Sequence, residues 1–270
     1  MNEKLNMTDK ELYETAIKFL LSFEGVTSEV LEKHLSAEHN KPNDLTLIYF
    51  KLCESAQNRQ MSSKVISGSI NGLENLSSVL YDFNPIEVSK NLKKDDSLLL
   101  LDIIIENLKP KGQIRRTSKS IWPQYCKSII DSAHFLSTFK NAENFYEWAN
   151  FFAHDSRAKA ALPLMIGYEI SGIGFPLACD FLKEIGFDEF GKPDVHLKEI
   201  FKAIGFLDES ENSQSKLDYQ TLKIIDRIAK ENNTSSYAVD KIFWLIGSGN
   251  FYLTGLNIGR QKKAFIERFD

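Results

Sequence analysis

Apolar residues recur along most of the chain with the three-to-four-residue spacing of amphipathic helices. This spacing predicts helices at about residues 8–23, 28–34, 43–60, 62–81, 120–139, 142–154, 156–170, 175–186, 194–204, 217–232, 236–247 and 259–268. The apolar run at 96–108 has the composition of a buried strand, but its length and its lack of a partner favour a helix. No two strand-like segments flank a hairpin turn, so we expect an all-α fold.

Several residues mark where these helices begin and end. Thr8 followed by Glu11 forms a capping box, and Pro85 suits the first turn of a short helix. Gly68 and Gly72 weaken the prediction of a helix at 62–81. The polar segment DESENSQSK, residues 208–216, is the clearest connecting segment in the sequence, and it precedes the C-terminal helices.

Composition places the chain among ordinary globular proteins. Its 270 residues suffice for one large domain or two smaller lobes, and it is 43% hydrophobic and 26% charged. The longest apolar run, residues 98–108, is too short to span a membrane and carries two acidic residues. The polar N-terminus is unlike a signal peptide, and the three cysteines are few and scattered. We therefore expect a cytoplasmic protein with reduced core thiols and no zinc or iron–sulfur site.

Charge is unevenly distributed. The net charge of −4 argues against a nucleic-acid binder, yet residues 107–130 contain six basic residues and no acidic one. Those six basic residues are Lys109, Lys111, Arg115, Arg116, Lys119 and Lys127. Alone, this stretch is typical of a solvated basic loop. Beside a phosphate-binding element it would favour contact with a DNA backbone.

Such an element is predicted at Ser171-Gly172-Ile173-Gly174, between two helical patterns. The two glycines permit a tight turn and a close backbone approach, and Ile173 is expected to plug the core. Amide N–H groups at the start of the second helix can then hold a phosphate oxygen. An ordinary turn between two helices is the alternative.

A candidate catalytic carboxylate follows about twenty residues later. Asp194 comes directly after Pro193, two residues before His196. Asp is favoured at helix N-caps, so a purely structural role is the simpler interpretation. Both roles are compatible, because a capping carboxylate that stays ionised can stabilise a cationic sugar.

The hairpin, with Ala178 in the helix after it, and the Asp-x-His motif resemble the helix-hairpin-helix (HhH-GPD) DNA glycosylase superfamily over residues 158–205. The resemblance implies two helical lobes with DNA in the cleft between them. We expect the hairpin lobe at about 62–205 and the second lobe from 1–61 and 206–270. It also implies that Asp194 is catalytic and that the DNA backbone is contacted by Ser171, Gly172, Ile173, Gly174, His196, Arg115, Arg116 and Lys119.

One position departs from the pattern of the bifunctional members of this superfamily. They carry a nucleophilic Lys two residues after the second hairpin glycine, where this chain has Pro176. Proline has no amine, so we expect water to be the nucleophile and lyase activity to be absent.

The extruded base needs a pocket of flat or apolar side chains. The candidates are Phe175, Pro176, Asp180, Phe243, Trp244 and Trp122, although aromatic residues at helical spacing more often belong to the core. Gln57, Asn58 and Gln60, at a polar helix junction, are weaker candidates for contact with the gap left in the duplex.

The sequence thus predicts a monofunctional DNA glycosylase acting on double-stranded DNA, with no membrane and no obligate protein partner. No cofactor is expected, and a monovalent cation at the hairpin is the one exception left open. The KPDVHL and VDKIFWLIGSGNFY segments are similar to a bacterial phage-defence branch, which implies glucosylated hydroxymethylcytosine as the base. The alternatives are a repair glycosylase for an oxidised or alkylated purine and a non-catalytic DNA-binding module.

Overall fold

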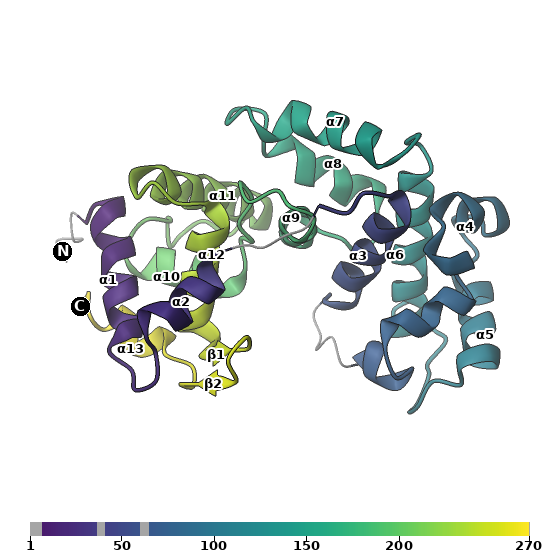
Figure 1. Ribbon diagram of the computed structural model, residues 1–270, viewed down its shortest axis with the longest axis horizontal. Coiled ribbons are helices and arrows are strands. Elements are labelled where there is room, and N and C mark those ends of the chain that lie inside the picture. The colour runs from purple at the N-terminus through teal and green to yellow at the C-terminus, as the bar shows by residue number, and fades with distance from the viewer. Residues whose placement is uncertain (1–6, 37–40, 60–64, 270) are drawn as a thin grey trace. The chain divides into compact units, whose positions relative to one another are not determined.

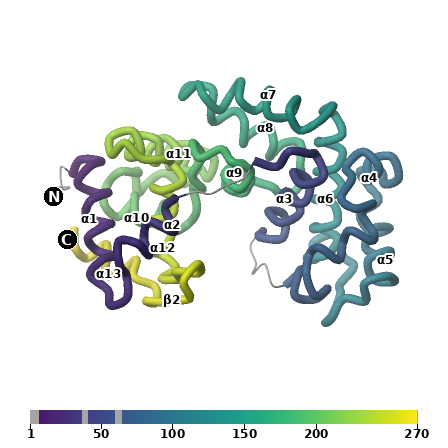
Figure 2. Tube along the Cα trace, viewed as in Figure 1, coloured from purple at the N-terminus to yellow at the C-terminus, as the bar shows by residue number. Residues whose placement is uncertain are grey.

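The computed structural model describes residues 7–36, 41–59 and 65–269, and helices dominate these ranges (Figure 1). Contacts divide the chain into two compact units. Unit 2 is the continuous segment Asn40–Ile185, and unit 1 joins Met1–His39 to Gly186–Asp270 (Figure 2). The expected lobes had their boundaries near 62 and 205. The contacts instead place residues 40–61 with the hairpin segment and residues 186–205 with the chain ends.

Unit 2 is built around one helix, α6. Its α-helices are α3 (Leu45–Gln57), α4 (Pro85–Asn91), α5 (Ser97–Leu108), α6 (Ile121–Leu136), α7 (Ala142–Ala153), α8 (Ala161–Glu169) and α9 (Phe175–Glu184). α6 packs against α3, α4 and α5, and most of its residues are buried. α5 confirms that the apolar run at 96–108 is helical.

Unit 1 is built around α12 in the same way. Its elements are α1 (Asp9–Leu21), α2 (Ser28–Leu35), α10 (Val195–Ala203), α11 (Gln214–Glu231), α12 (Ser236–Ser248), β1 (Asn250–Phe251), β2 (Leu256–Asn257) and α13 (Lys262–Ile266). α12 packs against the other five helices, so both ends of the chain contribute to one hydrophobic core. The capping box at Thr8 and Glu11 is confirmed at the start of α1.

Two secondary-structure predictions were wrong. Within 62–81 the described residues form short 3₁₀ helices, at Ser67–Ser69 and Leu73–Ser78, because Asn71 and Gly72 take positive φ angles that break an α-helix. β1 and β2 form an antiparallel pair in which Phe251 faces Leu256. With two residues in each strand, the pair is too short to show an alternating pattern in the sequence.

All three cysteines are buried and none forms a disulfide, as expected. Burial raises the pKa of the Cys53 and Cys126 thiols well above the ordinary value. These thiols therefore stay protonated and belong to the core of unit 2.

Candidate functional site

The predicted hairpin is present in unit 2 between α8 and α9. Gly172 has a φ of 87°, in the left-handed region that favours glycine, and Ile173 is 1% exposed. A methyl group on Gly167 would lie 3.1 Å from the carbonyl oxygen of Ile173, so α8 meets the turn at close range. Gly174 is different, because its φ is −79° and, among the described residues other than its two chain neighbours, an added methyl meets only Pro176 Cδ within 4 Å, at 3.9 Å.

Two side chains of α6 hold the hairpin by hydrogen bonds to its backbone. The Ser171 N–H donates to Asp131 Oδ2 at 3.1 Å, and the Ser128 hydroxyl donates to the Ser171 carbonyl at 2.5 Å. The Ile173 N–H donates to the Ile170 carbonyl at 3.2 Å. The amides of Ser171 and Ile173 are therefore engaged within the protein, and their expected contact with DNA cannot use these N–H groups.

Other amides of the turn remain available. Among the described residues, none accepts a hydrogen bond from the N–H groups of Gly172, Gly174 or Leu177. No side chain of the described ranges caps the N-terminus of α9, and Pro176 in its first turn has no N–H. The hairpin thus presents a short row of free donors at a helix N-terminus, which is the arrangement that suits a phosphate oxygen.

Arg59 adds a positive charge to this turn. A methyl on Gly172 would lie 2.9 Å from Arg59 Nη1, so the guanidinium lies against the hairpin. The residues predicted from the sequence at this helix end were Gln57, Asn58 and Gln60, and Arg59 was not among them. Gln57 is 7% exposed, Asn58 ends α3 at the surface, and Gln60 lies outside the described residues. The polar residues at the end of α3 were the sequence feature that pointed to this region, and the fold brings Arg59 of that segment against the hairpin.

Asp194 is in unit 1 and caps α10. Its Oδ1 accepts the N–H groups of His196 at 2.8 Å and Leu197 at 3.1 Å. The side chain is partly exposed. The expected capping role is therefore confirmed.

α12 lies against the segment that carries Asp194. Asp240, 2% exposed, accepts the Lys192 N–H at 3.1 Å, and a methyl on Gly247 would lie 2.4 Å from the His196 ring. These two positions are seven residues apart, so they share one face of the helix. One face of α12 therefore contacts both the loop before Asp194 and the His196 ring, and so frames the Asp-x-His motif from one side.

Electrostatics at this site oppose ionisation. Burial raises the pKa of Asp194, the Asp240 carboxylate raises it further, and the Leu197 amide hydrogen bond and the His196 and Lys192 charges act against that rise. Burial lowers the pKa of His196, and its Nδ1 is buried without a hydrogen-bond partner among the described residues. The capping hydrogen bonds favour the ionised form of Asp194, as expected. Its burial and the neighbouring Asp240 carboxylate favour the protonated form.

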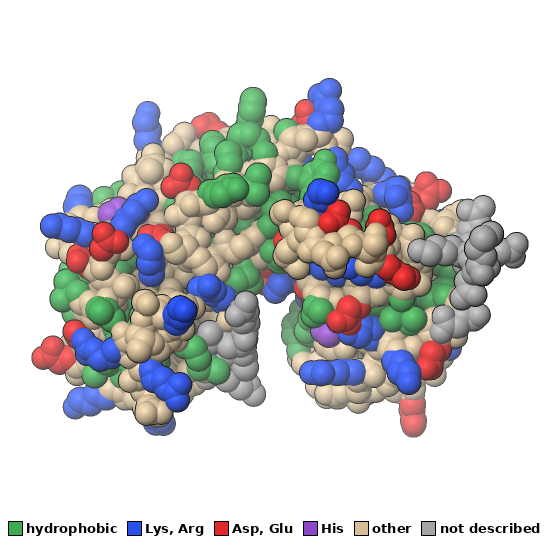
Figure 3. Space-filling model, turned by 180° about the vertical axis from the view of Figure 1, so that it is seen from behind, with side chains coloured by type: hydrophobic (Ala, Val, Ile, Leu, Met, Phe, Trp, Pro, Cys, Tyr) green, Lys and Arg blue, Asp and Glu red, His purple; other side chains and the backbone are tan. Residues whose placement is uncertain are grey.

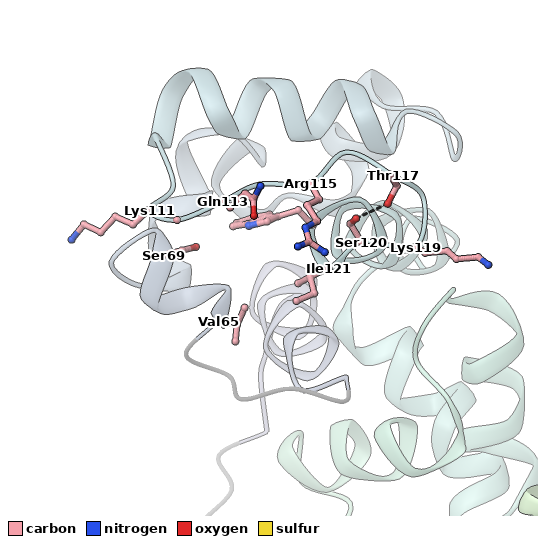
Figure 4. A pocket seen from close by; sticks show the side chains of 11 residues that line it. Val65, Ser69, Lys111, Gln113, Arg115, Thr117, Lys119, Ser120 and Ile121 are labelled. Carbon is pink, nitrogen blue, oxygen red and sulfur yellow. Dashed lines mark hydrogen bonds between the residues drawn. The ribbon is translucent and has the colours of Figure 1, made fainter.

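The basic stretch of unit 2 borders a surface pocket of about 750 Å³ (Figure 4). Arg115 and Lys119 line it, together with Trp122. The Thr117 and Ser120 hydroxyls lie 2.6 Å apart at its edge. No described residue lining the pocket is acidic. Elsewhere positive and negative side chains are interspersed, as the face in Figure 3 shows.

Arg116 does not join this pocket. Its guanidinium forms a two-pronged ion pair with Asp102 of α5, with Nη2 2.8 Å from Oδ2. An arginine held in this way has fewer donors left for DNA, so the expected contact from Arg116 is weakened.

The aromatic candidates divide by burial. Phe243 is fully buried and packs edge-on against Phe201, so it belongs to the core and not to a base pocket. Trp122 is 6% exposed. Trp244 is half-buried, and its ring meets that of Tyr252 at 5.8 Å. It lies four residues after Asp240, on the α12 face that frames the Asp-x-His motif.

The remaining candidates lie in α9. Phe175 and Pro176 are partly buried in its first turn. Asp180 is paired with Lys183 at 3.0 Å. Its carboxylate would have to leave that ion pair to receive a hydrogen bond from a base.

The fold itself has a known counterpart. The structure superposes on that of the 8-oxoguanine glycosylase/lyase of Methanocaldococcus jannaschii, bound to a 15mer DNA containing 8-oxoguanine, with a TM-score of 0.54. The match covers 87% of this chain and 96% of the other, at 15% identity. The chain therefore shares the fold of that archaeal protein. This confirms the predicted all-α fold class.

Sequence comparison is consistent with that fold. The chain is 27% identical over 81 residues to an 8-oxoguanine DNA glycosylase/AP lyase of Korarchaeum cryptofilum. That match covers 30% of this chain and 39% of the relative's length. No family model matches the chain. Both named proteins are glycosylase/lyases for an oxidised purine, and neither supports the phage-defence branch.

No helix in the described ranges is long and apolar enough to cross a membrane.

Proposed function

We propose that this protein is a DNA glycosylase that releases a damaged purine from double-stranded DNA. The observation that carries the proposal is Asp194, a partly buried N-cap carboxylate in an Asp-x-His motif, within a glycosylase fold. The hairpin amides, Arg59 and Arg115 would hold the DNA backbone. His196 would contact a further phosphate.

The chemistry follows from the charge of Asp194. As the bond between C1′ and the base nitrogen breaks, positive charge develops on the sugar, and a carboxylate fixed nearby stabilises it. The base nitrogen takes up a proton, so the base leaves as a neutral species. A water oxygen bonds to C1′ and the water gives up one proton, which balances the proton gained by the base. Asp194 either accepts the proton from the water or orients the water.

We propose that the enzyme works without a protein nucleophile. Pro176 stands where a bifunctional member would carry its amine, and proline cannot form a Schiff base. The two named relatives are described as lyases, so this chain would differ from them in the group that attacks C1′, which is water in place of an amine, and in lacking strand cleavage.

An oxidised purine is the substrate class that the comparisons favour, because both relatives are named for 8-oxoguanine. Trp244 is the side chain best placed to stack on the extruded base. Its ring is half-buried on the α12 face beside Asp240. Glucosylated hydroxymethylcytosine, the base implied by the phage-defence resemblance, belongs in the same substrate panel.

The test is base release from duplexes that each carry one modified base. The wild-type protein is expected to release the oxidised purine and leave an intact abasic site. The Asp194→Asn variant should lose release by about 10²-fold or more while keeping its DNA affinity, because Asn also caps a helix.

Asp44→Asn is the matched control. Asp44 caps α3 in the same way, with its Oδ1 2.7 Å from the Leu47 N–H. Release that survives in Asp194→Asn would refute the catalytic role. DNA binding without release of any base would instead identify a binding module.

A further inference from the structure

The loop before Asp194 is tied to α12 at two points. The Tyr237 N–H donates to the Asp188 carbonyl at 3.0 Å, and the Lys192 N–H donates to Asp240 Oδ2 at 3.1 Å. The second contact is made by a side chain and lies two residues before Asp194. Because the chain reaches α10 directly afterwards, the Asp240 contact helps to decide where Asp194 stands.

Gly191 shows how closely this loop is pressed onto the unit. A methyl group there would lie 2.8 Å from Ile225 Cγ2 and 2.9 Å from the Ser236 carbonyl oxygen. No side chain fits at this position without a shift of backbone. Pro193 follows and restricts the backbone again. The loop therefore has little freedom, and the side chain that accepts the Lys192 N–H is a carboxylate.

A carboxylate is an unusual anchor here, because an amide or a hydroxyl would accept the same hydrogen bond without charge. Asp240 is 2% exposed, and burying its charge costs free energy. Its charge acts on Asp194 and raises the pKa of that group. The opposing charges come from Lys192 in the loop and His196 in α10, while Arg260 and Lys262 face His196.

We propose that Asp240 is a positioning residue for Asp194. Its hydrogen bond to the Lys192 N–H holds the backbone ahead of Asp194, and its carboxylate places a negative charge near the Asp194 side chain. The inference depends on the proposed function only in taking Asp194 as the working carboxylate. It assigns Asp240 no contact with DNA or water. Two neighbouring carboxylates would attract a positively charged sugar more strongly than one.

The first test observes Asp194 directly and needs no enzymatic activity. The protein is labelled with ¹³C at the Asp carboxyl carbons, and its Asp194 signal is identified as the one missing in Asp194→Asn. In Asp240→Asn the titration midpoint of Asp194 should move toward acid by on the order of one pH unit. Asn keeps an oxygen acceptor for the Lys192 N–H, so the change removes charge and retains the anchor.

Asp218→Asn is the matched control. Asp218 is another buried carboxylate of unit 1, 5% exposed and paired with Lys198, and its charge is not among those acting on Asp194. The Asp194 midpoint should stay in place in this variant. An Asp194 midpoint that is equally unmoved in Asp240→Asn would overturn the proposal.

If Asp240→Asn does not fold, the variant Asp240→Ser replaces it, because a hydroxyl removes the charge and can still accept a hydrogen bond. An Asp194 midpoint that is unmoved in Asp240→Ser would contradict the proposal.

The second test separates anchor from charge by the pH dependence of kcat/KM for base release. Asp240→Asn should shift the acidic limb of the profile and keep most of the plateau. Asp240→Ala loses the anchor as well and should also lower the plateau. Identical profiles for wild type and Asp240→Asn would refute the assignment. Absence of base release in the wild type, with the carbon signals behaving as expected, would refute the glycosylase function and leave the anchor and the charge coupling standing.

Discussion

The two hairpin glycines offer a test that separates folding from DNA contact. Gly172→Ala places a methyl 2.7 Å from Ser128 Oγ and 2.9 Å from Arg59 Nη1, at a φ of 87°. The left-handed backbone alone costs an alanine about 1–2 kcal/mol. The melting temperature should therefore fall by about 2–8 °C.

Gly174→Ala should behave in the opposite way. With a φ of −79° and Pro176 Cδ 3.9 Å away, the added methyl meets no clash among the described residues. Alanine also has fewer conformations in the unfolded chain, which stabilises the protein by about 0.4–1 kcal/mol at a compatible site. If a phosphate approaches the Gly174 N–H, the methyl will crowd it and DNA affinity will fall.

The assays are thermal unfolding and fluorescence anisotropy with a short labelled duplex, at several salt concentrations. The decisive result is the pairing of retained or raised stability with weakened binding in Gly174→Ala. Wild-type affinity in that variant would show that the strand does not approach the backbone of the hairpin at this point, and the phosphate cradle would have to be abandoned.

Three further predictions concern other parts of the site. Arg115→Ala should reduce the slope of log affinity against log salt by about one unit, whereas Arg116→Ala, whose guanidinium is already paired, should change it less; equal slopes for the two would contradict the assignment. Gly247→Ala should destabilise the protein by about 1–3 kcal/mol by pushing on His196, and His196→Ala should relieve most of that loss, so additive effects in chemical denaturation would show that the ring does not lie there. Borohydride should trap no covalent complex between the wild-type protein and its substrate, because Pro176 supplies no amine; a trapped adduct would reveal another nucleophile.

Local patterns were sufficient to find part of this site. The hairpin depends on residues 171–174, and the cap of α10 depends on residues 194–197, so each is encoded within one turn of chain. Burial of Ile173 between the two glycines was also predicted from this segment and is confirmed.

Features that depend on distant contacts could not be predicted in this way. Asp240 lies 48 residues from Lys192, and nothing near it marks it as an anchor. Phe243 and Trp244 are adjacent in sequence and were given the same role, yet a 100° step around α12 makes one fully buried and the other half-buried. Arg116 and Arg115 differ likewise, because the distant Asp102 engages only the former.

The discontinuity of unit 1 has a consequence for synthesis. α1 and α2 emerge from the ribosome early, but their partners α11 and α12 begin only at residue 214. At typical translation rates the two helices wait on the order of ten to thirty seconds with their apolar faces uncovered. During that interval unit 2, which is continuous, can already fold. Nascent chains of this protein should therefore depend on chaperones early, and conditions that slow elongation should lower the soluble yield.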